Sequence, residues 1–179
     1  MFQRLFGGRE RNRTITDALY AEIVAAARQP ALYSDWDVPD TPLGRFEMLS
    51  LHMFLFQHRV RGEAGTIREI AQVLTDDFFT EVEHSLRELG IGDMGVPKRM
   101  KKLARMFYGR TAAYADALER GDADALAVAL ARNIRPDATE WPQAATLAGY
   151  VIAADKALAG QDLEDIGSGR IRFPAAQAG

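Results

Sequence analysis

The sequence predicts an all-α protein, a single compact bundle of about seven helices with a short irregular C-terminal tail. Apolar residues recur at helical spacing over most of the 179 residues, and capping residues, prolines and glycines separate these stretches. No alternation of apolar and polar residues long enough for a sheet precedes the tail. With 47% hydrophobic and 26% charged residues, the chain is long enough to bury one core.

The chain divides into three parts on this pattern. Residues 1–13 are expected to form a flexible N-terminus that is both basic and apolar. Residues 14–160 carry the helical pattern and are expected to form the folded domain. Residues 161–179 lose the helical period, so we expect an extended or partly disordered tail.

Caps and prolines set the expected ends of the first two helices. A threonine, Thr14 or Thr16, starts the first helix, and Pro30 ends it. Thr41 as cap and Pro42 in the first turn start the second helix. Its centre is apolar on nearly every side, so we expect it in the middle of the bundle. The expected helices cover residues 14–30, 41–61, 65–74, 75–90, 97–120, 122–134 and 139–160.

The same kinds of residue set the ends of two later helices. Thr75 is expected to cap a helix that Gly90 ends, which makes the boundary with the preceding helix a turn. Thr139 is expected to cap the last long helix, and Gly160 to end it.

Composition limits the setting in which the protein works. The chain has no cysteine, which excludes disulfides and thiolate metal sites and fits a reducing compartment. The longest uncharged stretch of its most apolar region, residues 48–58, is too short to span a membrane, and the N-terminus lacks the apolar region of a secretory signal. We expect a cytoplasmic protein, with peripheral contact at the inner face of the cytoplasmic membrane as the second interpretation.

Catalytic residues are hard to find in this sequence. Glu81 and His84 have the E-x-x-H spacing of di-iron bundles, but no second such motif exists, and a surface pair is the preferred interpretation. His52 and His58 lie on different faces of one helix, as core or boundary residues do. No phosphate-binding or dinucleotide-binding glycine motif and no nucleophile elbow is present. We expect a protein that is not an enzyme and has no catalytic residue, metal or cofactor; a helical metal or haem enzyme is the alternative.

One helix concentrates the positive charge. Residues 98–110 contain six basic residues and no acid, although the chain has a net charge of -3. At 100° per residue, Val96, Met100, Leu103 and Phe107 share an inward face, while most of the cations lie on the outer side. Like charges at i and i+4 repel each other, so an acidic partner is expected.

Three acidic partners fit this helix. The first is the chain's own acidic loop, with Asp35, Asp37 and Asp40 around Trp36. The second is a nucleic acid, which the overall pI of about 5.7 disfavours because nucleic-acid-binding domains are usually basic. The third, which we prefer, is another protein or a lipid headgroup.

Three stretches together resemble one family. They are "GRFEMLSLHMFLFQHR" (residues 44–59), "DDFFTEVEHSLRELGIGDMGVPKRMKKLARMFYGR" (residues 76–110) and "AYADALERGD" (residues 113–122). They are similar to the ubiquinol-cytochrome c chaperone family, the cytochrome b assembly factors of mitochondria and alphaproteobacteria, and the likeness extends from about residue 36 to residue 150. The matching signature residues are Asp93, Pro97, Lys98, Arg99, Lys101, Lys102, Phe107, Tyr108, Gly109 and Arg110.

The resemblance implies an α-helical chaperone without enzymatic activity. Such a protein binds cytochrome b in its new or inserting form and promotes assembly of the ubiquinol-cytochrome c reductase (bc1) complex of the respiratory chain. Family members in mitochondria also work beside a second assembly factor and at the ribosome. The rival hypothesis is an RNA or ribosome-binding adaptor that uses the same basic helix, although free nucleic acid is not expected as a ligand.

Glu47 is expected to favour the N-terminal dipole of the second helix, and Arg45 to lie at the surface or in the site.

Two sets of residues are the candidates for binding the partner. An apolar groove is expected beside Phe54, Phe78, Phe79 and Phe107. The expected partner-binding residues are Lys98, Arg99, Lys101, Lys102, Arg105, Tyr108 and Arg110.

Overall fold

The computed structural model is all-α over the residues it describes, which are 2–92 and 94–177, with side chains from residue 13 onward. The all-α prediction is therefore confirmed. Two of the helices, α2 and α8, are only 5 residues long. The helices are α1 (Phe2–Ala27), α2 (Pro30–Ser34), α3 (Pro42–Arg59), α4 (Thr66–Glu88), α5 (Val96–Arg120), α6 (Ala123–Ile134), α7 (Gln143–Ala159) and α8 (Leu163–Gly167).

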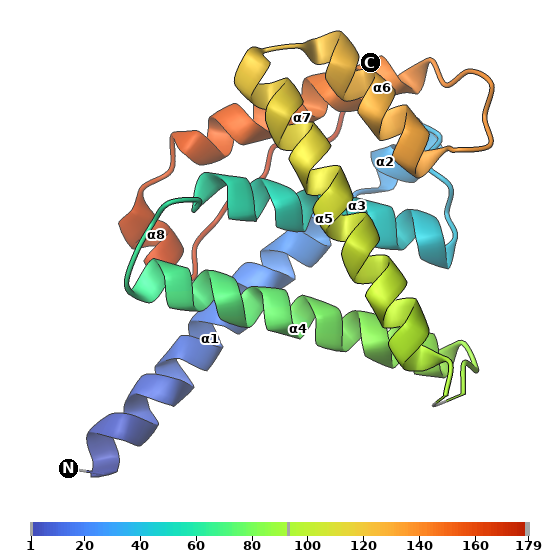
Figure 1. Cartoon of the computed structure of the whole chain (residues 1–179). Coiled ribbons are helices and arrows are strands. Elements are labelled where there is room, and N and C mark those ends of the chain that lie inside the picture. Colours follow the sequence, from blue (N-terminus) through green and yellow to red (C-terminus); the bar gives the residue numbers. More distant parts are fainter. Residues whose placement is uncertain (1, 93, 178–179) are drawn as a thin grey trace.

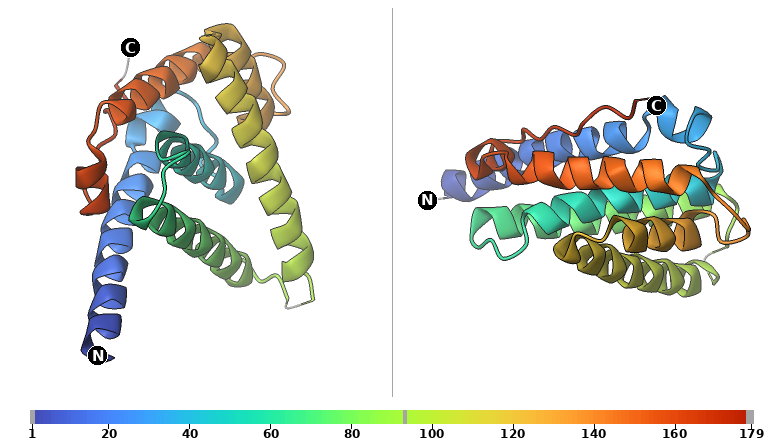
Figure 2. Two further views of the ribbon diagram at one scale, coloured as in Figure 1. Left: turned by 60° about the vertical axis from the view of Figure 1, so that its left-hand side comes forward. Right: turned by 90° about the horizontal axis from the view of Figure 1, so that it is seen from above.

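The helix α3 lies at the centre of the bundle, as its apolar surface predicted. It contacts α1, α4, α5, α6 and α7, and its residues from Leu51 to Phe56 are all buried. Figure 1 shows α5 crossing in front of α3 and α4, with the N-terminal end of α1 extending beyond the other helices. In the view from above in Figure 2, α5 and α6 form one outer side, and α1 with the C-terminal segment forms the other.

Several helix ends follow the predicted capping chemistry. Thr41 Oγ1 accepts a hydrogen bond from Gly44 N (3.1 Å), and Pro42 occupies the first position of α3. Gly90 follows the last turn of α4 with a φ of 78°, a left-handed conformation that suits glycine.

Three expected helix ends are wrong. Residues 66–88 form one continuous helix, because the Thr75 hydroxyl donates within the helix to Ala71 O (2.8 Å) and accepts from Gln57 (2.9 Å) instead of capping. Thr139 does not cap α7, which starts at Gln143. The helix α1 starts at Phe2, well before the threonines expected to cap it.

The C-terminal segment packs along the body rather than leaving it. After α8, which contacts α4, the chain continues without helix to residue 177. Gln29 holds its end: Nε2 donates to Pro174 O (3.2 Å), and Oε1 accepts from Ala176 N (2.6 Å). Gln161 forms two further hydrogen bonds to the backbone of Arg172.

His52 is a core histidine, completely buried beneath this segment. Its Nδ1 lies 2.8 Å from Met48 O, and its Nε2 lies 2.9 Å from the Tyr150 hydroxyl. The Phe173 ring packs edge-on against the imidazole at 5.4 Å between centroids. A neutral imidazole that donates from Nδ1 and accepts at Nε2 satisfies both contacts. Burial lowers the pKa of His52 from 6.5 to about 4.

Acid should destabilise the protein through His52. Between pH 4 and 6.5 the unfolded chain binds a proton that the folded chain does not, so this stability is present above pH 6.5 and lost towards pH 4. We expect the stability difference between the wild type and His52→Gln to shrink by about 3 kcal/mol over this range in urea unfolding. The exposed His84→Gln is the control, and a difference for His52→Gln that stayed constant with pH would contradict the assignment.

Candidate partner-binding groove

An open groove lies between α3, α4 and the N-terminal half of α5, next to the C-terminal end of α1. It has a volume of about 1560 Å³. One wall comes from α5 and carries five cations together with Leu103 and Met106. The opposite wall comes from α3, α4 and the turn after α4, and its apolar residues are Leu43, Phe46, Leu49, Val82, Leu86, Leu89 and Ile91.

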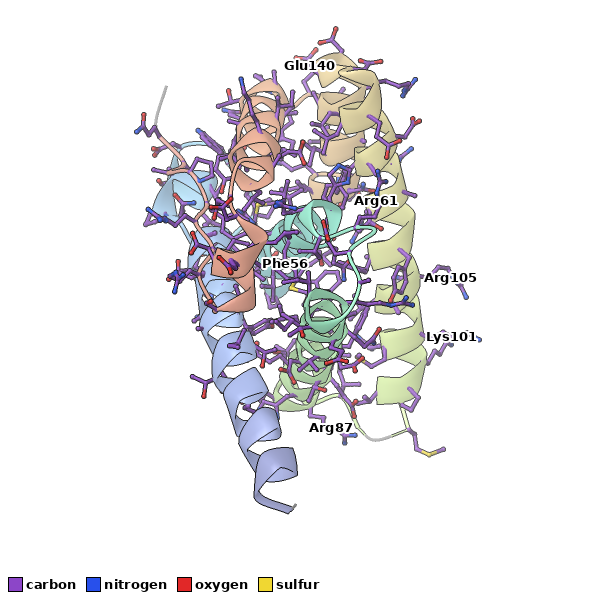
Figure 3. All side chains as sticks on the ribbon, turned by 90° about the vertical axis from the view of Figure 1, so that its left-hand side faces the viewer. Phe56, Arg61, Arg87, Lys101, Arg105 and Glu140 are labelled. Carbon is purple, nitrogen blue, oxygen red and sulfur yellow. The ribbon has the colours of Figure 1, made fainter. Side chains whose placement is uncertain are left out.

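The cations of the α5 wall are exposed and form no ion pair with the residues that the structure describes. Figure 3 shows the side chains of Lys101 and Arg105 extending away from the helix. All five cations are exposed, and within the part of the chain that the structure describes none of them forms an ion pair. We call them the α5 cations: Lys98, Arg99, Lys101, Lys102 and Arg105.

The acidic loop does not neutralise the α5 cations, although the sequence allowed it to. Asp37 pairs with Arg135, and Asp40 pairs with Arg45 at 2.7 Å. Asp35 accepts a hydrogen bond from the neighbouring Ser34 hydroxyl (2.7 Å). Each acid of this loop therefore has another partner, and Arg45 takes part in a surface ion pair.

The acids that line the groove also have partners. Glu81 accepts a hydrogen bond from the Tyr20 hydroxyl (3.0 Å), and Glu88 lies 3.2 Å from His84. The third acid, Asp40, is the partner of Arg45. The positive charge of the α5 wall thus faces acids that are already engaged.

Arg110 differs from the other signature cations because it faces the core. Its Nη1 lies 2.6 Å from Glu47 Oε1, and the two side chains are only 12% and 2% exposed. The contact is close but not aligned as a hydrogen bond, and neither atom has another partner in the described chain. Burial is the largest influence and raises the pKa of Glu47 to about 7, while the Arg110 charge opposes the rise. The pair joins α3 to α5.

The expected aromatic residues lie beside the groove rather than on its surface. Phe78 and Phe107 are fully buried, with ring centroids 5.3 Å apart, and Phe79 packs against both. Phe54 is buried farther along α3, against Tyr114. None of the four lines the groove, because they form the core that supports its walls.

Leu43 and Leu89 are groove residues that the sequence analysis missed. They are 50% and 58% exposed, and both belong to the apolar wall. Their signal in the sequence was weak, because a leucine near a helix end is equally consistent with the edge of a core.

The remaining signature residues have varied places. Tyr108 is 56% exposed, and its ring packs against Phe107 and Phe79 outside the groove. Pro97 lies in the first turn of α5, as expected. Gly109 is exposed within α5, and a Cβ atom there would meet nothing within 4 Å, so no contact in the described chain requires glycine. Asp93 lies outside the described residues.

A metal or catalytic centre is not assembled from the histidines. His52 is enclosed in the core, His58 lies 3.6 Å from Asp155, and His84 contacts Glu88. In the described residues no group of three or more His, Cys, Asp or Glu side chains is arranged to hold a metal ion. No helix there is long and apolar enough to cross a membrane.

An all-α bundle with an open groove that combines apolar residues with a cationic wall is typical of a protein that binds another macromolecule. The family model described as "Ubiquinol-cytochrome C chaperone" matches residues 34–173. The chain therefore belongs to the ubiquinol-cytochrome c chaperone family, as the resemblance predicted. No curated protein matches the sequence.

A solved structure agrees with the family assignment. The crystal structure of the Cbp3 homolog from Brucella abortus is 52% identical to this chain. The match covers 98% of each chain with a TM-score of 0.91. Family and fold together support a chaperone role in the assembly of the bc1 complex.

Proposed function

We propose that this protein is a non-enzymatic chaperone that binds cytochrome b and keeps it competent for assembly into the bc1 complex. The observation that carries the proposal is the row of exposed α5 cations, which form no ion pair with the described residues, beside a partly exposed apolar wall. An apolar surface supplies binding energy, and unpaired charge at its edge steers the partner and fixes its orientation.

Membership of the family supports the client, because its members are described as chaperones of the ubiquinol-cytochrome c system. Binding of this kind is reversible and needs no nucleotide, which agrees with a sequence that has no phosphate-binding motif. We place the protein in the cytoplasm, in contact with the membrane through its client.

Charge reversal on α5 tests this function. Replacing Lys98, Lys101, Lys102 and Arg105 by glutamate should reduce co-purification of cytochrome b from a native membrane extract by about tenfold or more. The melting temperature should stay nearly unchanged, because these exposed cations form no ion pair in the described chain.

The matched control makes the same charge change elsewhere. Arg68, Arg132, Lys156 and Arg172 are exposed, lie outside the groove and form no ion pair in the described residues. Their replacement by glutamate should leave cytochrome b recovery at the wild-type level. Equal recovery with the α5 variant and the control variant would refute the proposed site, and no recovery with the wild type would refute the proposed client.

A further inference from the structure

The two walls of the groove differ in chemistry. Leu103 and Met106 are the apolar lining residues of α5, which otherwise presents the α5 cations. Across the groove, α3, α4 and the turn after α4 present apolar side chains, including the half-exposed Leu43 and Leu89, together with the polar residues Arg45, Glu81, Ser85 and Glu88. An occupant that contacts both walls therefore needs an apolar side and an anionic side.

The spacing of the cations favours a long occupant over a compact one. Lys98 and Arg105 lie about 10 Å apart along the axis of α5, because each helical residue rises about 1.5 Å. A single phosphate or lipid headgroup engages one point of this row. A helix that carries carboxylates at i, i+4 and i+7 engages its full length.

The groove is large enough to take part of a helix. Its volume is about 1560 Å³, and a helix with its side chains is about 10 Å wide. Single-stranded nucleic acid fits less well, because its bases stack on aromatic rings, and among the described residues of the lining only Tyr33 and Phe46 carry one.

We propose that the groove binds one amphipathic helix of the client, with its acidic side against the α5 cations and its apolar side against α3 and α4. The inference rests on the proposed function for the identity of the client, and the occupant's chemistry comes from the groove itself. Occupation of the groove shields the apolar side of this helix from water until assembly.

The probe for this inference is a fluorescently labelled synthetic helix of about 14 residues, with leucines at i, i+3, i+4 and i+7 and glutamates at the flanking positions. We expect saturable binding in fluorescence anisotropy. Replacing Lys98, Arg99 and Lys102 by glutamine should weaken binding about tenfold or more, and so should the double variant Leu43→Ser with Leu89→Ser. Arg68, Arg132 and Lys156 replaced together by glutamine form the control, which should bind like the wild type.

Four further binding measurements distinguish an acidic amphipathic helix from other occupants of the groove. A peptide of the same composition in scrambled order, which has no apolar side, and a peptide with lysine in place of glutamate should both fail to bind. Equal binding of the scrambled peptide would overturn the inference, because charge alone would then explain the affinity. Preferential binding of oligouridylate, or of vesicles containing phosphatidylglycerol, would overturn it in favour of nucleic acid or lipid.

The outcomes separate this inference from the proposed function. If the peptide fails to bind while cytochrome b is still recovered and depends on the α5 cations, the occupant is not an acidic amphipathic helix and the function stands. If the peptide binds but the wild type recovers no cytochrome b, the groove chemistry stands and the client is wrong.

Discussion

Replacing Arg110 by methionine is expected to lower the free energy of unfolding by about 1 kcal/mol at about pH 8 relative to its effect at about pH 5, measured by urea unfolding. The variant removes the cation beside Glu47, whose side chain is 2% exposed, so the buried carboxylate either stays charged without this counter-ion or takes up a proton. Removing one member of a buried ion pair is costly because the remaining charge has lost both water and its counter-ion.

The loss should depend on pH in a defined direction. The pKa of Glu47 in the folded chain, about 7, lies above its ordinary 4.5, so the folded state holds the proton more tightly. The corresponding stability is present below pH 4.5 and is lost as the pH rises through 7. At about pH 5 folded Glu47 is neutral with or without Arg110, so the Arg110→Met variant should approach the wild type at that pH.

Two variants control this experiment. Glu47→Gln removes the charge, and the double variant with Arg110→Met removes both partners, so it should be closer to the wild type than Arg110→Met alone at about pH 8. A loss that is the same at both pH values, or a double variant as unstable as Arg110→Met, would show that the charges of the pair are not responsible.

Replacing Phe107 by alanine is expected to cost about 3–5 kcal/mol, the largest loss that we predict for a single side chain. Phe107 is fully buried, and its ring centroid lies 5.3 Å from Phe78 and 5.7 Å from Phe79 on α4. The loss combines the transfer of a large apolar side chain with the cavity that remains between α4 and α5.

Denaturant unfolding of Phe107→Ala measures this loss, and amide hydrogen exchange locates it. Protection should fall first in the N-terminal half of α5, because this ring packs that part of the helix on α4. Val128→Ala is the control, since Val128 is 68% exposed and its replacement should change stability by less than about 0.5 kcal/mol. A loss below about 1 kcal/mol for Phe107→Ala would mean that the ring does not anchor α5.

The fold was predictable where local chemistry determines it. The cap at Thr41, the proline after it and an apolar surface on nearly every side identified α3 and its central position. The inward face of α5 followed in part from its period: Val96 and Phe107 are buried, whereas Met100 and Leu103 are half-buried and Leu103 lines the groove.

Tertiary contacts explain what the sequence did not reveal. The Thr75 hydroxyl can cap a helix or bond back within one, and it does the latter while it contacts Gln57 of α3. The C-terminal segment has no period of its own, and side chains distant in sequence, above all Gln29, hold it in place.

The candidate site was partly visible in the sequence. The density of basic residues on one helix identified the cationic wall, because charge in sequence becomes charge on a helix face. Glu47 was interpreted through the helix dipole, and its burial with Arg110 was missed. A single acid within a strongly apolar helix was the available signal, since a buried carboxylate requires a cation nearby. The walls of the groove combine residues from three helices, and no pattern in the sequence indicated that these residues would lie together.

The hydrogen bond between Ala176 N and Gln29 also bears on the order of folding. It joins residues 147 positions apart, whereas neighbouring helices such as α6 and α7 meet across a short connection. Closing a loop of that length is entropically unfavourable until the helices between its ends have collapsed. This hydrogen bond therefore forms late in folding, and the C-terminal segment encloses His52 only after the bundle beneath it has formed.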